Sequence, residues 1–92
     1  MAQPNEEILA RFGIGRPYAI WPIQADVYKI SCMQGDFCLK FVRYDQEKID
    51  FLFQIMEYLL QNGFYRLSKP VAADGNESCL ATEDGFFTMN RW

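Results

Sequence analysis

The 92-residue sequence predicts an α+β fold: a curled antiparallel sheet of five to six strands, one long packing helix and a short N-terminal helix. Three observations predict this fold. Short apolar runs alternate with turns, several of them marked by Gly, over most of the chain. One segment, residues 46–62, instead repeats its apolar residues at helical spacing. A shorter helical segment precedes the first strand, and residues 1–92 are expected to form a single domain.

The first predicted helix lies within residues 3–15 and has signals for both of its ends. Pro4 suits the first turn, and the acidic residues after it complement the positive end of the helix dipole. Gly13 and Gly15 are expected to end the helix. Its small apolar face consists of Ile8, Leu9 and Phe12.

Three strands are predicted next, at residues 18–23, 26–32 and 36–43. Pro22 lacks a backbone N–H, which predicts an edge position or a bulge for the first of them. The second and third strands form a hairpin, and Gly35 in its turn is able to take a positive φ.

The loop of this hairpin is expected to comprise residues 34–36, which fixes the strand register. Cys32 would then face Cys38, and Ile30 would face Lys40. In this register Lys40 shares one face of the sheet with the apolar residues of the second strand. The opposite face, covered by the N-terminal helix, is formed by Phe37, Leu39 and Phe41.

The long helix, residues 46–62, begins after Asp45 as N-cap and ends at Gly63 in the left-handed conformation. Two apolar lines together cover roughly 220° of its circumference at about 100° per residue. A helix with so wide an apolar arc should contact other surfaces on two sides. The predicted core stripe is Ile49, Leu52, Phe53, Met56, Leu59 and Leu60, and the second line is Phe51, Ile55 and Tyr58.

The remaining segments, residues 68–75, 77–83 and 85–92, predict two or three further strands. Asp74-Gly75 and Asp84-Gly85 mark the turns between them. Their spacing does not match a calcium-binding loop, so these aspartates are interpreted as turn residues.

Composition excludes several classes of function. The net charge is −3 without a basic cluster, which argues against nucleic-acid binding. The chain has no histidine and only three cysteines without Cys-x-x-Cys spacing, so we expect neither a metal site nor a disulfide framework. No signal peptide and no membrane span are predicted. These features indicate a cytoplasmic compartment.

A lysine on the third of three antiparallel strands, followed by a long helix, resembles the amino-terminal lobe of kinases. The segments "ILARFGIG" and "VYKISCMQGDFCLKFVR" resemble the aminoglycoside phosphotransferase and choline kinase-like group. The second half, "YLLQNGF" and "KPVAADGNESCLATEDGFFTMNRW", is similar to CotS-type spore coat proteins. Those proteins have a kinase-like fold and typically show a Leu-x-x-x-Gly-Phe segment, an Asp-Gly turn and an aromatic strand ending in Trp.

The resemblance implies roles for individual residues. Lys40 matches the lysine that contacts the α- and β-phosphates of ATP, and Cys38 matches the small residue that roofs the adenine pocket. Met89 and Arg91 match the strand that leads to the hinge between lobes. Glu57 is the candidate ion-pair partner of Lys40, although the helix pattern favours a solvated position. The turn at residues 24–26, which should cover the phosphates, contains no glycine.

Two functions stay open at this point. The chain is expected to be a fragment of a longer protein, namely the nucleotide-cleft lobe of a spore-coat kinase-like protein. This lobe has no catalytic residue, because the catalytic Asp and Asn and the metal-binding Asp of kinases lie in the carboxy-terminal lobe. The alternative is a structural or assembly module of the spore coat that has lost nucleotide binding. The sequence leaves open whether the parent is a small-molecule phosphotransferase or a pseudokinase.

The resemblance also implies ligands, partners and location. ATP with magnesium is expected only in the full-length parent, and none is expected for this chain alone. The expected partners are the missing carboxy-terminal lobe and a second copy of the chain, in a two-fold dimer through Phe51, Ile55 and Tyr58 or the C-terminal aromatics. The expected location is the mother-cell cytoplasm, with deposition in the spore coat.

Overall fold

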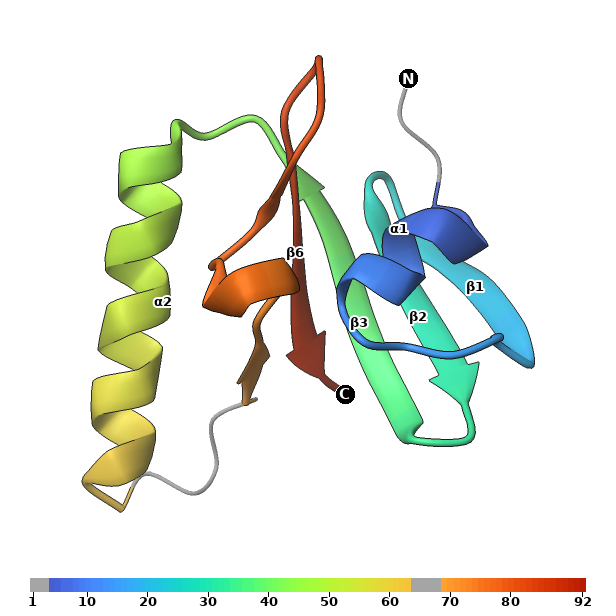
Figure 1. Cartoon of the computed structure of the whole chain (residues 1–92), viewed down its shortest axis with the longest axis horizontal. Helices are drawn as coiled ribbons and strands as arrows, with labels where there is room; N and C mark the ends of the chain where they lie inside the picture. The colour runs from blue at the N-terminus through green and yellow to red at the C-terminus, as the bar shows by residue number, and fades with distance from the viewer. Residues whose placement is uncertain (1–3, 64–68) are drawn as a thin grey trace.

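The computed structural model describes residues 4–63 and 69–92 of the chain. In chain order the elements are α1 (Glu6–Arg11), β1 (Ala19–Gln24), β2 (Val27–Cys32), β3 (Gly35–Val42), α2 (Gln46–Gln61), β4 (Pro70–Val71), the 3-10 helix η1 (Asp74–Asn76), β5 (Leu80–Ala81) and β6 (Phe86–Arg91) (Figure 1). The strands form one sheet in the order β1-β2-β3-β6-β4, with β5 also paired to β6. All pairings are antiparallel. The predicted α+β fold class is thereby confirmed.

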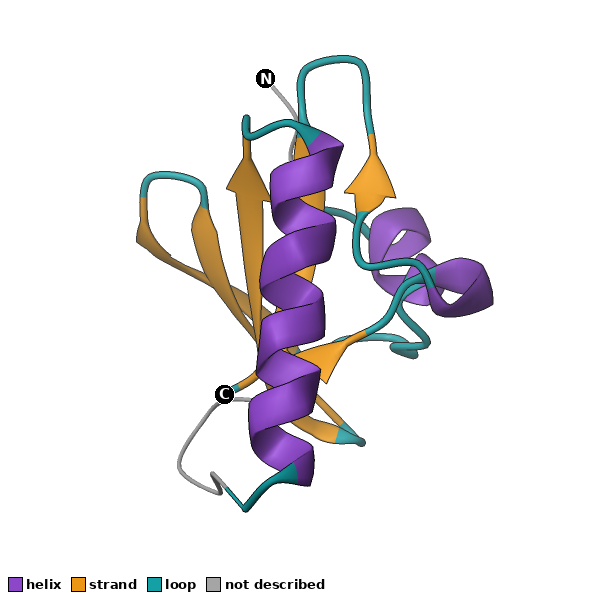
Figure 2. Cartoon of the chain, turned by 90° about the vertical axis from the view of Figure 1, so that its left-hand side faces the viewer, coloured by secondary structure: helices purple, strands orange, loops and turns teal. Residues whose placement is uncertain are grey.

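The two helices lie on opposite faces of the sheet. In Figure 1 α1 crosses in front of β2 and β3, whereas α2 runs beside the sheet beyond β6. Figure 2 shows α2 lengthwise in front of the strands, with α1 away to one side. One face of the sheet is therefore next to α1 and the other next to α2, and the two faces differ in the polarity of their side chains.

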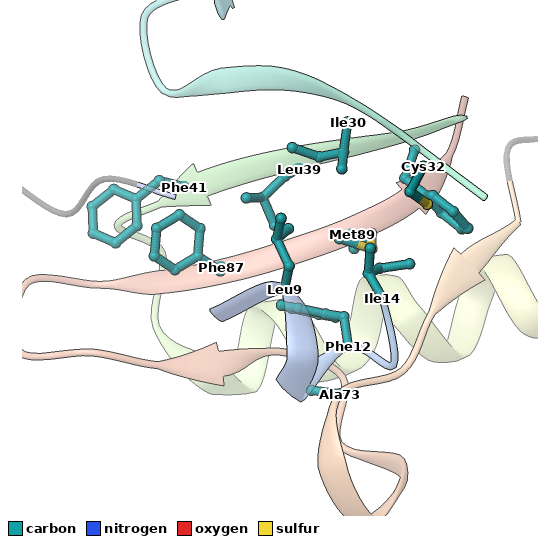
Figure 3. Packing of buried hydrophobic residues seen from close by; sticks show 11 residues of the cluster. Leu9, Phe12, Ile14, Ile30, Cys32, Leu39, Phe41, Ala73, Phe87 and Met89 are labelled. Carbon is teal, nitrogen blue, oxygen red and sulfur yellow. The ribbon is translucent and has the colours of Figure 1, made fainter. Parts of the chain in front are cut away.

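The hydrophobic core lies between α1 and the sheet (Figure 3). Leu9 of α1 and Leu39 of β3 are completely buried, and Phe87 of β6 packs against Phe41 with ring centroids 5.0 Å apart. This confirms that the face formed by the alternate residues of β3 is covered by the N-terminal helix. The buried members of the cluster are Leu9, Phe12, Ile14, Ile30, Cys32, Phe37, Leu39, Phe41, Ala73, Phe87 and Met89.

The predicted register of the β2–β3 hairpin is wrong by three residues. The turn contains two residues, Met33 and Gln34, so that Ile30 pairs with Phe37 and Cys32 pairs with Gly35. Lys40 instead pairs with Val27. Because side chains alternate along a strand, a slip by an odd number of residues moves every side chain to the other face. The observed register places Ile30 and Cys32 in the core, whereas the predicted one would have aligned Ile30 with a charged lysine.

The ends of α1 differ slightly from the prediction. Asn5 is the N-cap, and its side-chain oxygen accepts a hydrogen bond of 2.9 Å from the Ile8 N–H. Pro4 therefore lies just before the cap and not in the first turn. A capping side chain at residue 5 satisfies a free helical N–H, which proline alone cannot do. Gly13 follows the helix with φ +78°, in agreement with the predicted end.

Strand β1 is an edge strand with a bulge, as Pro22 predicted. It pairs only with β2, and the register shifts between Pro22 and Gln24. Proline cannot donate a ladder hydrogen bond, so a bulged edge is one of the few places in a sheet that tolerates it.

Helix α2 begins and ends as predicted but packs less tightly. The Asp45 side chain accepts a hydrogen bond from the Lys48 N–H at 3.0 Å, and Gly63 has φ +93°. Ile49 is buried, whereas Leu52 of the predicted core stripe is 46% exposed. The reason lies in the sheet, because its α2 face is lined by polar residues such as Thr88 and offers the helix little apolar area.

The second apolar line of α2 has no covering surface within the described residues. Phe51 is 54% exposed, Ile55 39% and Tyr58 65%. The outward side of the helix is therefore an apolar strip, which we call the α2 strip (Phe51, Ile55 and Tyr58). Contact on this second side, which the width of the apolar arc predicted, stays a prediction.

The two predicted Asp-Gly turns have different physical causes. Gly75 lies in η1 with φ +65°, a conformation that glycine adopts without steric cost. Gly85, in contrast, lies close to the end of β3, because an added Cβ would be 2.5 Å from the Val42 carbonyl oxygen and 2.9 Å from the Phe41 ring. Residue 68, the start of the strand predicted at 68–75, lies outside the described residues.

Replacing Gly85 by alanine should destabilise the fold, because the new methyl group overlaps backbone that cannot move without opening the β3–β6 ladder. Overpacking of this kind typically costs about 1–3 kcal/mol. The Gly15→Ala variant is the matched control, since the nearest atom to its Cβ is 3.9 Å away. Urea titration should show a lower free energy of unfolding for Gly85→Ala alone, and equal stability of both variants would contradict the assigned contact.

Candidate functional site

The sheet face that lies opposite α1 carries polar and charged residues in register. Cys38 and Lys40 of β3 are cross-strand partners of Asn90 and Thr88 of β6, and Lys29 of β2 is the partner of Cys38. Directly paired residues of antiparallel strands share one face. We call these five side chains the polar face of the sheet: Lys29, Cys38, Lys40, Thr88 and Asn90.

Lys40 is exposed at the centre of this face, between Val27 and Thr88. Within residues 4–63 and 69–92 no carboxylate lies within ion-pair distance of its ammonium. Glu57, the candidate partner, is exposed on α2 and is not paired with it. The Lys40 ammonium is therefore solvated and available to an anion.

Cys38 is half-buried beside Lys40. Burial raises the pKa of its thiol, because a thiolate loses hydration in the interior, and the positive charge of Lys40 lowers that pKa by a smaller effect. The thiol is accordingly neutral at physiological pH. A small neutral side chain at this position leaves room above the sheet without adding charge.

An aromatic and a basic side chain meet at the end of the polar face. The Lys29 ammonium lies 4.7 Å from the centroid of the Trp92 ring and 3.8 Å from a carboxylate oxygen of Asp36. The Trp92 N–H donates a hydrogen bond of 3.0 Å to the Asp36 carbonyl oxygen, which extends the β6 pairing by one residue. Lys29, Trp92 and Asn90 were absent from the predicted site. The alternation of strand residues would have identified them, given the correct register.

Met89 and Arg91 point to the other face. The Met89 side chain is 2% exposed within the core, and the Arg91 guanidinium lies over the Phe37 ring, 5.4 Å from its centroid. The structure thus brings Cys38 and Lys40 together but separates their side chains from those of Met89 and Arg91. The latter two residues adjoin the polar face only through their backbone.

The β1–β2 turn, which was expected to cover phosphates, is held by Asp26. This residue has φ +63°, and its carbonyl oxygen accepts a hydrogen bond of 2.8 Å from the Phe41 N–H. Its carboxylate accepts a 3.3 Å hydrogen bond from Arg43. Aspartate is among the residues that tolerate the left-handed conformation, so the turn forms without glycine. The turn therefore lacks the glycines whose backbone amides approach the phosphates in glycine-rich phosphate loops.

Two further findings concern the described part of the chain. Among its residues no group of three or more Cys, Asp or Glu side chains is arranged to hold a metal ion. None of the helices described here is long and apolar enough to cross a membrane.

The fold is similar to that of one part of a solved phosphotransferase. The chain superposes on an aminoglycoside phosphotransferase from Alicyclobacillus acidocaldarius subsp. acidocaldarius DSM 446 with a TM-score of 0.75 and 12% sequence identity. The match covers 100% of this chain and spans 27% of the length of that protein. No protein-family model and no curated protein matches the chain. At this identity the comparison shows a kinase-like fold.

The pH dependence of Cys38 alkylation tests the electrostatics of the polar face. Because burial raises the thiol pKa, iodoacetamide should react appreciably only above the pH at which an ordinary thiol ionises. Lys40→Ala removes a charge that stabilises the thiolate, so the pKa should rise further and the rate profile should move to higher pH. Mass spectrometry of the Cys38 peptide measures the rate.

The control for that experiment is Lys48→Ala, which removes an exposed lysine that lies over the Tyr44 ring. Its alkylation profile should equal that of the unmodified sequence. A profile that stays unchanged in Lys40→Ala would contradict the electrostatic contact between Lys40 and Cys38.

Proposed function

We propose that this chain is the nucleotide-cleft lobe of a longer kinase-like protein and that it runs no phosphoryl transfer by itself. The observation that supports this most directly is Lys40: an exposed ammonium without an ion-pair partner in the described residues, on the third strand of a kinase-like sheet. A lysine in this place of a kinase lobe pairs with the phosphates of ATP.

In this proposal the residues on and next to the polar face contact different parts of the nucleotide. Lys40 supplies the positive charge for the phosphates, and Cys38 supplies the small neutral surface above the base. Met89 and Arg91 contribute backbone groups at the hinge, since their side chains lie on the other face. The ligand of the full-length parent is ATP with magnesium, whose charge neutralises the phosphate oxygens when the metal is bound.

The parent is proposed to be a spore-coat protein of the CotS type. This rests on the sequence resemblance of the second half, from "YLLQNGF" to Trp92. The parent would work in the mother-cell cytoplasm, with deposition in the spore coat. Its carboxy-terminal lobe would provide the catalytic Asp and Asn and the metal-binding Asp.

One observation favours the second candidate function, a structural module of the spore coat without nucleotide binding. The β1–β2 turn, which was expected to cover the phosphates, contains no glycine, and the Asp26 carboxylate in it is paired with Arg43 at 3.3 Å. Without glycine, the backbone N–H groups of the turn cannot approach a phosphate as closely. A protein that does not bind ATP would have no reason to avoid this arrangement.

ATP binding discriminates the two functions. Isothermal titration of the full-length parent with ATP and magnesium should show binding that Lys40→Ala weakens by about tenfold or more, because a charge-assisted contact contributes roughly 1.5–3 kcal/mol. Lys48→Ala, which removes a lysine outside the polar face, should bind ATP like the unmodified protein.

Two results would reject the phosphate role. Absence of ATP binding in the parent would favour the structural module. Binding that Lys40→Ala leaves unchanged would place the nucleotide elsewhere.

We also propose that the chain associates with a second copy through the α2 strip. Ile55 lies between Phe51 and Tyr58 along the strip, so an antiparallel two-fold contact would place Phe51 of each copy against Tyr58 of the other. The exposed C-terminal aromatic Trp92 is the alternative contact.

Sedimentation equilibrium tests this association. The chain should form dimers at high concentration, and Tyr58→Glu should shift the equilibrium to monomer by placing a charge in the apolar contact. Gln54→Glu on the polar arc of the same helix is the control and should stay dimeric. A chain that is monomeric at every concentration would refute the proposal.

A further inference from the structure

A cavity of about 380 Å³ lies on the core side of the sheet, away from the polar face. The loop after α1 forms one wall, β4 forms the other, and β3 and β6 provide the floor. Sites for small molecules typically have volumes of about 300–1,000 Å³. The cavity is thus large enough for a compact organic ligand.

Hydrogen bonds fix both walls in place. The Gln34 side-chain amide donates to the Gly13 carbonyl oxygen at 2.8 Å, which ties the loop after α1 to the β2–β3 turn. The Ile14 N–H donates to the Leu9 carbonyl oxygen at 3.0 Å. On the other wall, the Arg91 N–H donates to the Lys69 carbonyl oxygen at 2.8 Å and anchors the start of β4. A ligand would therefore meet a site that is already formed, which lowers the entropic cost of binding.

Apolar side chains form much of the lining on both sides of the cavity. Phe12 and Phe37 are each 4% exposed and Ile14 is 5% exposed, so these side chains are fixed by the core and present only an edge to the cavity. Val71 of β4 closes the opposite side. Such a lining suits an apolar body and contributes about 25 cal/mol per Å² of apolar surface removed from water.

The charged residues of the lining are both positive. They are Lys69 and Arg91, in a chain whose 12 acidic residues outnumber its 9 basic ones. Neither is within ion-pair distance of a carboxylate in the described residues. The Arg91 guanidinium lies over the Phe37 ring, and it donates no side-chain hydrogen bond within residues 4–63 and 69–92. A guanidinium binds carboxylates through two parallel hydrogen bonds, so the site would select an anion.

We propose that this cavity binds a small organic acid, in which a carboxylate on Arg91 and Lys69 is joined to a compact apolar group packed against Ile14 and Val71. The same chemistry could come from a free acid or from the C-terminal residue of a peptide. The site lies on the opposite face from Lys40, so it does not depend on the proposed nucleotide function.

Phenylacetate is a suitable probe of the site. Titration of the chain, followed by two-dimensional NMR of backbone and side-chain amides, should give saturable shifts at Gly13, Val71 and the Gln34 side chain. 2-Phenylethanol has the same apolar group without the charge and should bind at least tenfold more weakly. A peptide ending in Gly-Gly-Phe, compared with its amidated form, shows whether a peptide carboxylate also enters.

Two variants test the contribution of the Arg91 charge and that of the cavity volume separately. Arg91→Gln should weaken phenylacetate binding by about tenfold or more, since it removes a charge-assisted pair. Ala72→Phe should abolish binding by filling the cavity while both cations stay in place. Arg16→Gln, at an arginine whose side chain is 89% exposed, is the matched control and should bind like the unmodified chain.

The amide spectra also report whether each variant is folded. If Arg91→Gln fails to fold, the comparison of Ala72→Phe with the unmodified chain decides. Shifts that map outside the cavity, equal binding of 2-phenylethanol, or undiminished binding to a folded Arg91→Gln or Ala72→Phe variant would overturn the proposal.

Discussion

The packing of α1 on one face of the sheet is the contact on which the rest of this structure depends. Leu9 is completely buried there, together with Leu39 and Phe87 of the sheet. Burial of each such side chain contributes about 1.5–3 kcal/mol. A domain of this size buries a modest share of its surface, so few other contacts can replace this one. The apolar residues of β3 and β6 point into this core. The residues that alternate with them point to the opposite face of the sheet, where polar side chains can be accommodated.

The polar face follows directly from this alternation of side chains along β3 and β6. Lys40 lies between two core residues of β3, and the alternation of the strand directs it away from α1. The charge costs little, because the ammonium stays in water. The same alternation explains why α2 packs loosely: it crosses a face with few apolar side chains, and only Ile49 is buried in the helix. One pattern along the strands thus accounts for both the exposed lysine and the loose packing of α2 on the sheet, where Leu52 is 46% exposed.

The sequence predicted the fold class, the order of the elements and most of their ends. These features depend on local signals, such as the Asp45 cap, the positive φ at Gly63 and the missing N–H of Pro22. The register of β2 and β3 was not predictable in the same way, because Gly35 can lie inside a three-residue turn or directly after a two-residue turn. Burial of the apolar residues of β2 in the core determines the register, and this core forms only in the complete fold.

The differences between the expected and the observed polar face follow from the register. The predicted register was displaced by three residues and put Lys40 on the same face as Ile30 and Cys32, so the contact of Lys29 with Trp92 could not be foreseen. Met89 and Arg91 were selected by resemblance, which gives the position of a strand but not the direction of each side chain. The core-side cavity has no linear signal, since its walls come from segments far apart in the chain.

The bulged edge at Pro22 has a consequence for how copies of this chain can meet. A regular edge strand invites another sheet to continue its hydrogen bonding, which is a common route to aggregation. β1 exposes Trp21 and Ile23 on this edge, at 55% and 52%, so its side chains alone would favour such stacking. The missing donor of Pro22 and the register shift after it interrupt the ladder that stacking requires. The backbone of β1 therefore disfavours fibre-like growth from this edge, although the side chains exposed there are apolar.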